Sequence, residues 1–305
     1  MINQRSLPEE ELLLFCIAGH IMEVTVPNAL DWEQVLPSFK PFRSYSSERQ
    51  NVICSIRIVE QPIVIEPDSA QVLSESFDVV GYWFCLMETE QNYISDMQFV
   101  EKGNCYRMMS NKTFSTSTAY VDWNDPSADI VLTSFLMIAF AHSAVLHGTL
   151  LIHASVVEKD WSGYAFLGKS GMGKSTHSSL WLRYVEGTEL LNDDNPAIRI
   201  EEDGSVYIYG TPWSGKTPCY KNSRAPLKAL VRLEQAPANS FTWKEGTDAL
   251  IALLPSCSSM RWNTLLYTGM CNLLEVIITK VKVGYLKCLP DQEAALLCYE
   301  EMKKI

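Results

Sequence analysis

The chain has 305 residues, of which 47% are hydrophobic and 20% are charged, and its formal net charge at pH 7 is −11. This length and apolar content predict two folded domains and exclude an intrinsically disordered chain. Residues 1–125 hold 8 Lys and Arg against 18 Asp and Glu. This acidic excess argues against a nucleic-acid partner, because nucleic-acid binding needs a basic surface for phosphate contacts.

The cysteines and the first residues indicate a cellular compartment. The nine cysteines are irregularly spaced and form neither a Cys-x-x-Cys pair nor a Cys/His cluster of zinc spacing, so we expect reduced core thiols. Residues 1–11 are polar and acidic, which does not predict a secretory signal. We therefore expect a cytoplasmic protein.

Residues 1–125 are expected to form a mostly β N-terminal domain. Short apolar or alternating runs, bounded by Pro, Asn, Asp and Gly, are typical of strands. The runs are 12–18, 22–26, 52–59, 77–87 and 105–109.

A connecting helix is predicted at about 127–147, at the start of a second domain that covers 126–305. Asp125, Pro126 and Ser127 form a helix start signal, and the apolar run that follows is about 17 residues long. Polar residues such as His142 and Ser143 interrupt this run, whose length is at the bottom of the range for a membrane span. We therefore expect a buried helix and no membrane partner.

The second domain contains a G-x-x-x-x-G-K-S motif, the P-loop or Walker A pattern. The strand-like run 164–167 enters it and helix-forming residues 174–184 follow it. In such a loop, backbone N–H groups surround phosphate oxygens, the lysine supplies positive charge and the serine hydroxyl binds Mg²⁺. The sequence therefore predicts an ATP and Mg²⁺ site, with Ser175 as a metal ligand and Lys174 beside the phosphates. The predicted nucleotide-binding residues are Gly168, Lys169, Ser170, Gly171, Met172, Gly173, Lys174, Ser175 and Thr176.

A pair of carboxylates, Asp193 and Asp194, follows a short apolar run about 20 residues after the loop. In phosphoryl transfer one carboxylate holds the metal, and another can accept the proton of the attacking hydroxyl. The alternative is an Asx turn before Pro196, because Asn-Asp-Asp-Asn-Pro is also favourable turn chemistry. The loop favours the functional interpretation, since it needs a metal-binding acid downstream.

Other candidate site residues are a histidine and several cations. His153 is expected in a strand at 150–157, next to the strand that enters the loop, where its imidazole could position a carboxylate or relay a proton. A satisfied core histidine is the alternative. A cation beyond Lys174 is needed to stabilise the transferred phosphoryl group, and Lys216 and Arg224 lie in a segment that we expect to be a mobile loop. Lys221 and Arg261 are further candidates, and a solvated basic loop is the alternative.

The remaining segments predict an α/β domain. Strands are expected at 197–200, 206–209, 229–233 and 284–288, and helices at 246–254, 263–278 and 291–303, the last capped by Asp291.

The order of these motifs resembles the HPr-kinase-related proteins. The resemblance rests on the His-Ala strand, the GKSGMGKS loop, the Leu-Leu-Asn-Asp-Asp segment and Gly-Thr-Pro-Trp-Ser-Gly at 210–215, and it extends through 225–236. It implies a mixed-sheet P-loop domain similar to HPr kinase/phosphorylase and phosphoenolpyruvate carboxykinase, preceded by the mostly β domain. It also implies an ATP-dependent phosphotransferase in which Asp193 is the base and Asp194 the metal ligand, or the reverse. Thr176 stands where HPr kinase carries an acid, so the acceptor need not be HPr.

These observations predict a Mg-ATP-dependent kinase. The expected partners are a nucleotide and a hydroxyl acceptor on a protein, a peptide or a small molecule such as serine. A homo-oligomer is compatible with the sequence. Two alternatives stay open: an ATPase or carboxykinase-type metabolite enzyme, and a non-catalytic module that binds a nucleotide or a leader peptide. The acid pair argues against the module, because two adjacent like charges beside a phosphate site cost stability.

Overall fold

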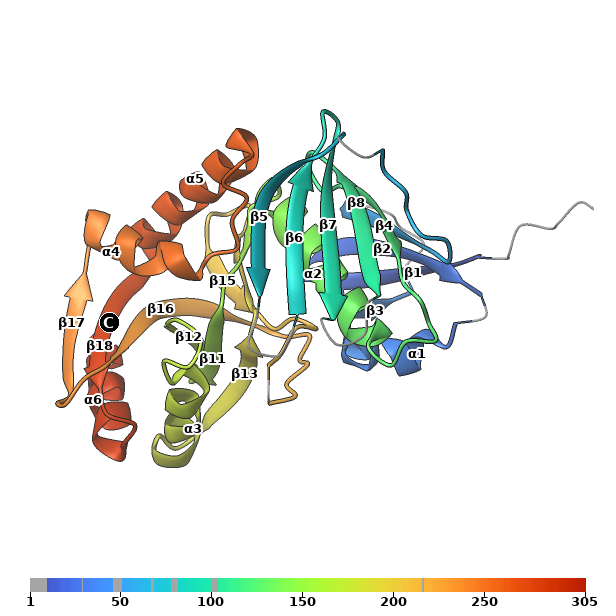
Figure 1. The fold of residues 1–305 in the computed structure, drawn as a ribbon. Coiled ribbons are helices and arrows are strands. Elements are labelled where there is room, and N and C mark those ends of the chain that lie inside the picture. Colours follow the sequence, from blue (N-terminus) through green and yellow to red (C-terminus); the bar gives the residue numbers. More distant parts are fainter. Residues whose placement is uncertain are drawn as a thin grey trace, which may run out of the picture. The chain divides into compact units, whose positions relative to one another are not determined.

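The computed structural model of the chain describes residues 10–28, 30–45, 51–66, 69–77, 82–99, 104–215 and 217–305. The protein is an α/β protein with two mixed β-sheets. The chain divides into two compact units, Met1–Ser143 and Ala144–Ile305, each with one of these sheets (Figure 1).

The first unit contains a nine-stranded sheet in the order β3-β1-β2-β4-β9-β8-β7-β6-β5, which curls into a half-barrel (Figure 1). The strands β2, β4 and β9 are parallel neighbours and the other pairs are antiparallel. The strands are β1 (Glu10–Ile17), β2 (His20–Pro27), β3 (Arg43–Ser44), β4 (Val52–Val59), β5 (Gln71–Phe77), β6 (Tyr82–Glu88), β7 (Asn92–Phe99), β8 (Cys105–Asn111) and β9 (Thr116–Tyr120). A short helix α1 (Trp32–Val35) and a 3₁₀ turn η1 (Pro37–Phe42) precede β3.

The apolar helix α2 (Ala128–Val145) follows the first sheet in the chain. Among the described residues it is the one helix long and apolar enough to cross a membrane, and 61% of it is buried in the fold. Its His142 ring packs on Phe114, with 4.7 Å between ring centroids. All but its last two residues belong to the first unit, whereas the sequence places this helix at the start of the second domain.

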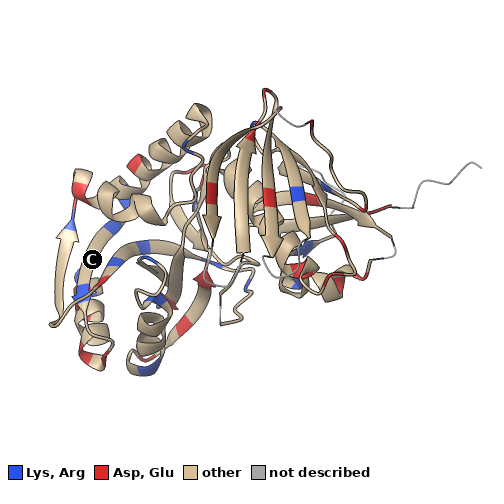
Figure 2. Ribbon diagram, in the orientation of Figure 1, with Lys and Arg blue, Asp and Glu red and all other residues tan. Residues whose placement is uncertain are grey.

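Acidic and basic residues both lie on strands of the first sheet (Figure 2). Glu75 of β5, Asp96 of β7 and Arg107 of β8 lie in one row across the sheet, because Glu75 pairs with Cys85 of β6, Cys85 pairs with Asp96, and Asp96 pairs with Arg107. Arg107 pairs with Asp96 at 2.6 Å.

The second unit contains another nine-stranded mixed sheet. Its main path runs β10-β14-β15-β16-β12-β11-β13, and β18 pairs with β16 and β17. The strands are β10 (Thr149–Leu151), β11 (Ala154–Lys159), β12 (Ser162–Leu167), β13 (Thr188–Asp194), β14 (Ala197–Ile200), β15 (Val206–Tyr209), β16 (Arg224–Gln235), β17 (Ser240–Lys244) and β18 (Lys282–Cys288). The helices are α3 (Lys174–Tyr184), α4 (Gly246–Leu253), α5 (Thr264–Lys280) and α6 (Gln292–Met302), with a 3₁₀ turn η2 (Leu254–Ser256) after α4.

Two helical layers cover the second sheet because its strands carry apolar side chains on both faces. On β12, Tyr164 and Phe166 belong to the core that contains Trp181 of α3 and Ala295 of α6. Ala165 and Leu167, the alternate residues, belong to the core under α4 and α5. This two-residue alternation follows from strand geometry, and full burial of an aromatic side chain such as Phe166 stabilises the fold by about 1.5–3 kcal/mol.

The segment predicted as one strand at 150–157 is two strands, β10 and β11, separated by Ile152 and His153. The break arises because the chain changes partners there: Ile152 N donates to Pro196 O, and His153 N donates to Ser256 O at 2.7 Å. The predicted strand at 77–87 corresponds to β6 and the last residue of β5, and residues 78–81 lie outside the described residues.

Gly210 is expected to be indispensable for the second unit. A Cβ atom added there would lie 2.1 Å from the backbone oxygen of Lys221, so Gly210→Ala should destabilise the unit by about 1–3 kcal/mol through overpacking. Gly269→Ala is the matched control, because its Cβ would meet no backbone atom but side-chain methyl groups of Val145 at 3.0 Å and Leu146 at 3.9 Å, and alanine favours the helix. Urea unfolding measures both, and equal midpoints for Gly210→Ala and the unaltered chain would contradict the prediction.

Candidate active site

The loop 168–173 joins the buried strand β12 to helix α3. Gly171 and Gly173 adopt left-handed φ values of 78° and 100°, which other residues adopt only with strain. No atom lies within 4 Å of a Cβ built at either glycine, so the loop is open beside them. Gly173 is also the N-cap of α3 and brings no side-chain acceptor to the first-turn N–H groups. These donors suit an anion such as phosphate.

Lys174 is the first residue of α3, and its side chain turns back to the loop. Its ammonium group donates to Gly168 O at 3.2 Å and to Lys169 O at 3.5 Å. Burial lowers the pKa of Lys174 below its ordinary value, and the charges of Asp194 and Asp193 oppose this shift. The ammonium therefore lies in the field of both carboxylates.

Strand β11 brings the acid pair to the same edge of the sheet as the loop. It pairs antiparallel with both β12 and β13, so these two strands run in the same direction. Ala154 lies opposite Leu167, the last residue of β12, and opposite Asp194, the last residue of β13. The ends of the two strands are therefore separated by one strand, about 10 Å.

A β-bulge in β13 determines which way the acids point. Val156 pairs with Asn192 and Val157 pairs with Leu190, so Leu191 is an extra residue in β13. Beyond the bulge Asp193 lies opposite Ser155, and directly opposite residues point to the same face. Ser155 Oγ contacts Ser178 Oγ of α3 at 2.6 Å, so Asp193 lies on the sheet face that α3 covers.

Neighbouring side chains hold Asp194. His153 Nε2 lies 3.2 Å from Asp194 Oδ1, and Asn195 Nδ2 donates to Oδ2 at 2.9 Å. The Asp194 side chain is 37% exposed, whereas Asp193 as a residue is only 3% exposed. His153 lies in the link between β10 and β11 rather than within a strand. Asn195 was not among the predicted site residues, although it directly follows the acid pair in the sequence.

The Gly-Thr-Pro-Trp-Ser-Gly segment closes against the acid pair. Ser214 forms an isolated β-bridge with Asp194, and Gly215 N donates to Asp193 O. A Cβ added at Gly215 would lie 3.1 Å from that same oxygen. The glycine therefore allows the segment to approach the carboxylates closely.

The other predicted site residues are distributed as follows. Lys169, Ser170, Ser175 and Thr176 are exposed around the loop and the first turn of α3. Lys216 lies outside the described residues.

Arg224 is not brought to the loop. It starts β16, eight residues before Arg232, which lies opposite Leu167. Its guanidinium donates to Glu201 Oε1 and to Tyr209 OH, each at 2.7 Å. The expectation that Arg224 lies in a mobile loop is wrong, because this stretch pairs with β15 and the charge is already neutralised by Glu201.

The described residues contain no group of three or more His, Cys, Asp or Glu side chains that could hold a metal ion. Mg²⁺ keeps several waters and binds through one or two protein ligands together with phosphate oxygens. Ser175 and one carboxylate of the acid pair fit that role.

No protein-family model and no curated protein matches this chain. Among solved structures it is similar to the Hpr(Ser) kinase/phosphatase from Coxiella burnetii, with 13% sequence identity and a TM-score of 0.31. The similarity covers 50% of this chain and 91% of that one.

His177, on the first turns of α3, is a buried neutral histidine. Its ring packs edge-on against Phe166, with 4.6 Å between centroids, and its Nε2 accepts the indole N–H of Trp181 at 3.2 Å. Burial lowers its pKa from 6.5 to about 4.

The stability of the second unit should therefore fall in acid. Between pH 6.5 and 4 the unfolded chain binds a proton at His177 that the folded chain does not, so stability present above pH 6.5 is lost as the pH falls. From pH 7 to pH 5 this group should cost about 2 kcal/mol. His177→Gln retains a hydrogen-bond acceptor for Trp181 and cannot become charged. The stability that this variant loses between pH 7 and pH 5 should therefore be smaller by about 2 kcal/mol. Hydrogen exchange of the α3 amides in urea at both pH values measures the difference, and identical losses would refute the assignment.

Proposed function

We propose that this protein is a Mg-ATP-dependent kinase that transfers the γ-phosphate to a hydroxyl group of a protein, a peptide or a small molecule. The observation that carries the proposal is the meeting of a glycine loop and two carboxylates at one sheet edge, with Lys174 in the field of both. Phosphoryl transfer needs this combination, because the protein must bind phosphates, hold a metal and receive a proton.

Each group of the site has a role in this proposal. The N–H groups of the loop and of the first turn of α3 bind phosphate oxygens, and Lys174 adds positive charge. Ser175 and one carboxylate hold Mg²⁺, which when bound neutralises charge that develops on the phosphates. The other carboxylate accepts the proton of the acceptor hydroxyl. His153 positions Asp194, since its ring lies against one carboxylate oxygen while Asn195 holds the other.

Loss of the Lys174 charge should weaken nucleotide binding. Lys174→Met keeps much of the side-chain length and removes the ammonium, so Mg-ATP affinity should fall by at least about tenfold, or 1.4 kcal/mol. Lys169→Met, which removes an exposed charge from the same loop, is the matched control and should bind almost normally. Calorimetric titration with Mg-ATP provides the test, and unchanged affinity in Lys174→Met would remove this residue from the site.

The acid pair should be needed for transfer and not for folding. Asp193→Asn and Asp194→Asn are expected to melt within a few degrees of the unaltered chain and to lose transfer from radiolabelled ATP by about 10²-fold or more. Pools of amino acids, peptides and lysate proteins serve as acceptors. The exposed Asp160 supplies the control, Asp160→Asn.

Magnesium dependence separates the two roles. The variant that lacks the metal ligand should need more Mg²⁺ for half-maximal rate, and the variant that lacks the base should stay slow at saturating Mg²⁺. Full transfer by both variants would show that the pair takes no part in the reaction.

A further inference from the structure

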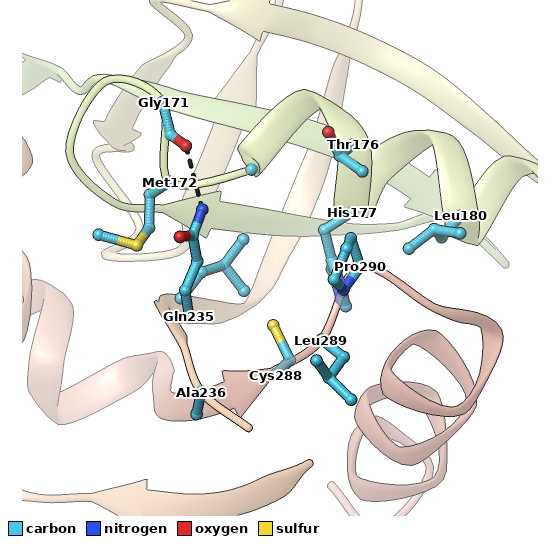
Figure 3. A pocket seen from close by; sticks show the side chains of 12 residues that line it. Gly171, Met172, Thr176, His177, Leu180, Gln235, Ala236, Cys288, Leu289 and Pro290 are labelled. Atoms are coloured by element: carbon cyan, nitrogen blue, oxygen red, sulfur yellow. Dashed lines mark hydrogen bonds between the residues drawn. The ribbon is translucent and has the colours of Figure 1, made fainter. Parts of the chain in front are cut away.

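A hollow of about 370 Å³ lies beside the glycine loop (Figure 3). This volume is within the usual range of ligand sites, about 300–1,000 Å³. Its lining includes Met172 of the loop, Leu180 of α3, Leu233 of β16 and, at the end of β18, Cys288, Leu289 and Pro290. None of its described lining residues is Asp, Glu, Lys or Arg.

The position of the hollow follows from the sheet topology. Strands β12, β16 and β18 are parallel neighbours, so their carboxyl ends meet at one edge. Ligands of open α/β sheets bind outside the carboxyl ends of the strands. Gln235 and Cys288, the last residues of β16 and β18, both line the hollow.

The hollow and the acid pair flank the loop on opposite sides. In the sheet, β16 and β18 lie on one side of β12, and β11 and β13 lie on the other. A nucleoside triphosphate is an elongated molecule with an uncharged base at one end and the γ-phosphate at the other. An apolar wall without charged groups cannot compensate the negative charge of a phosphate group. Two carboxylates can bind a phosphate group through a metal ion that lies between them and the phosphate.

The polar groups of the wall are neutral. His177 lines the hollow and is uncharged at neutral pH, with its Nε2 occupied by the Trp181 indole N–H. The Gln235 side-chain amide donates to Gly171 O at 3.3 Å, which links the wall to the phosphate loop (Figure 3). A few polar groups in an apolar wall are typical of sites that bind small molecules and cofactors.

We propose that this hollow binds the heterocyclic base and ribose of the nucleotide whose phosphates the loop holds. The inference rests on the proposed function, and it fixes the direction of the bound nucleotide: nucleoside over β16 and β18, γ-phosphate toward Asp193 and Asp194.

Comparison of Mg-ATP with Mg-tripolyphosphate isolates the contribution of the nucleoside. Both ligands fill the loop and only ATP reaches the hollow, so the unaltered chain should bind Mg-ATP at least about tenfold more tightly. Ala236→Trp places a large ring in the lining and should reduce the affinity for Mg-ATP to that for Mg-tripolyphosphate. The affinity for Mg-tripolyphosphate itself should not change in this variant. Ala238→Trp, two residues along and exposed outside the lining, is the matched control.

Alkylation of Cys288 gives a second measurement on the unaltered chain. In Figure 3 the Cys288 sulfur points toward the space between Gln235 and His177. Mg-ATP should slow the reaction of Cys288 with iodoacetamide by about tenfold at saturation, and Mg-tripolyphosphate should not. The exposed Cys105 is the internal reference in the same mass spectrum.

The outcomes separate this proposal from the proposed function. Mg-ATP binding that is unaffected by Ala236→Trp, together with unprotected Cys288, would overturn the nucleoside site and leave the phosphate site standing. Equal loss of both ligands in Ala236→Trp would also overturn it, because the effect would then lie in the loop. Failure of the unaltered chain to bind either ligand would refute both proposals.

Discussion

The candidate site depends on a single strand. Because β11 pairs antiparallel with β12 on one side and with β13 on the other, the glycine loop and the acid pair lie at the same edge of the sheet, one strand apart. Hydrogen bonds along the whole of β11 fix the distance between the glycine loop and the acid pair, so this distance does not depend on the conformation of a connecting loop. A site built in this way has its charged groups placed before any ligand arrives, which is the condition for effective electrostatic stabilisation.

The positive and negative charges at that edge partly offset one another. Lys174 is largely buried, which alone disfavours its ammonium form, and the two carboxylates oppose that effect. Two adjacent carboxylates in turn repel each other. Their repulsion is offset by Lys174 and by the His153 and Asn195 contacts to Asp194. Removal of any one partner therefore disturbs the others, and single substitutions here should not be additive.

Local signals in the sequence predict much of the second unit. The observed α3 has the predicted bounds, and Asn263 and Asp291 cap α5 and α6 through their side chains. These features depend on a few neighbouring residues, which explains why they can be read directly. The edge that unites the loop with the acids could be expected, because both follow apolar strands.

Pairing between distant segments could not be predicted. Strands β5, β7, β9 and β17 were missed, because runs such as Ser240–Lys244 mix polar and aromatic residues and become strands only beside their partners. The break at His153 depends on Ser256, about a hundred residues away. Arg224 lies in a segment whose composition is typical of a basic loop, and its place in β16 is set by pairing with Tyr209. The hollow beside the loop also has no local signal, since its wall combines three segments that are far apart in the sequence.

The extra residue at Leu191 has a consequence for how this chain can change over time. Deletion of that residue would make Leu190–Val157 and Asn192–Val156 consecutive pairs, so Asp193 would stay opposite Ser155 on the face that α3 covers. Loss of a second residue would set Asp193 opposite Val156, whose side chain belongs to the core under α4 and α5. The length of β13 between Leu190 and the acids can therefore shrink by one residue without reversing Asp193, and not by two.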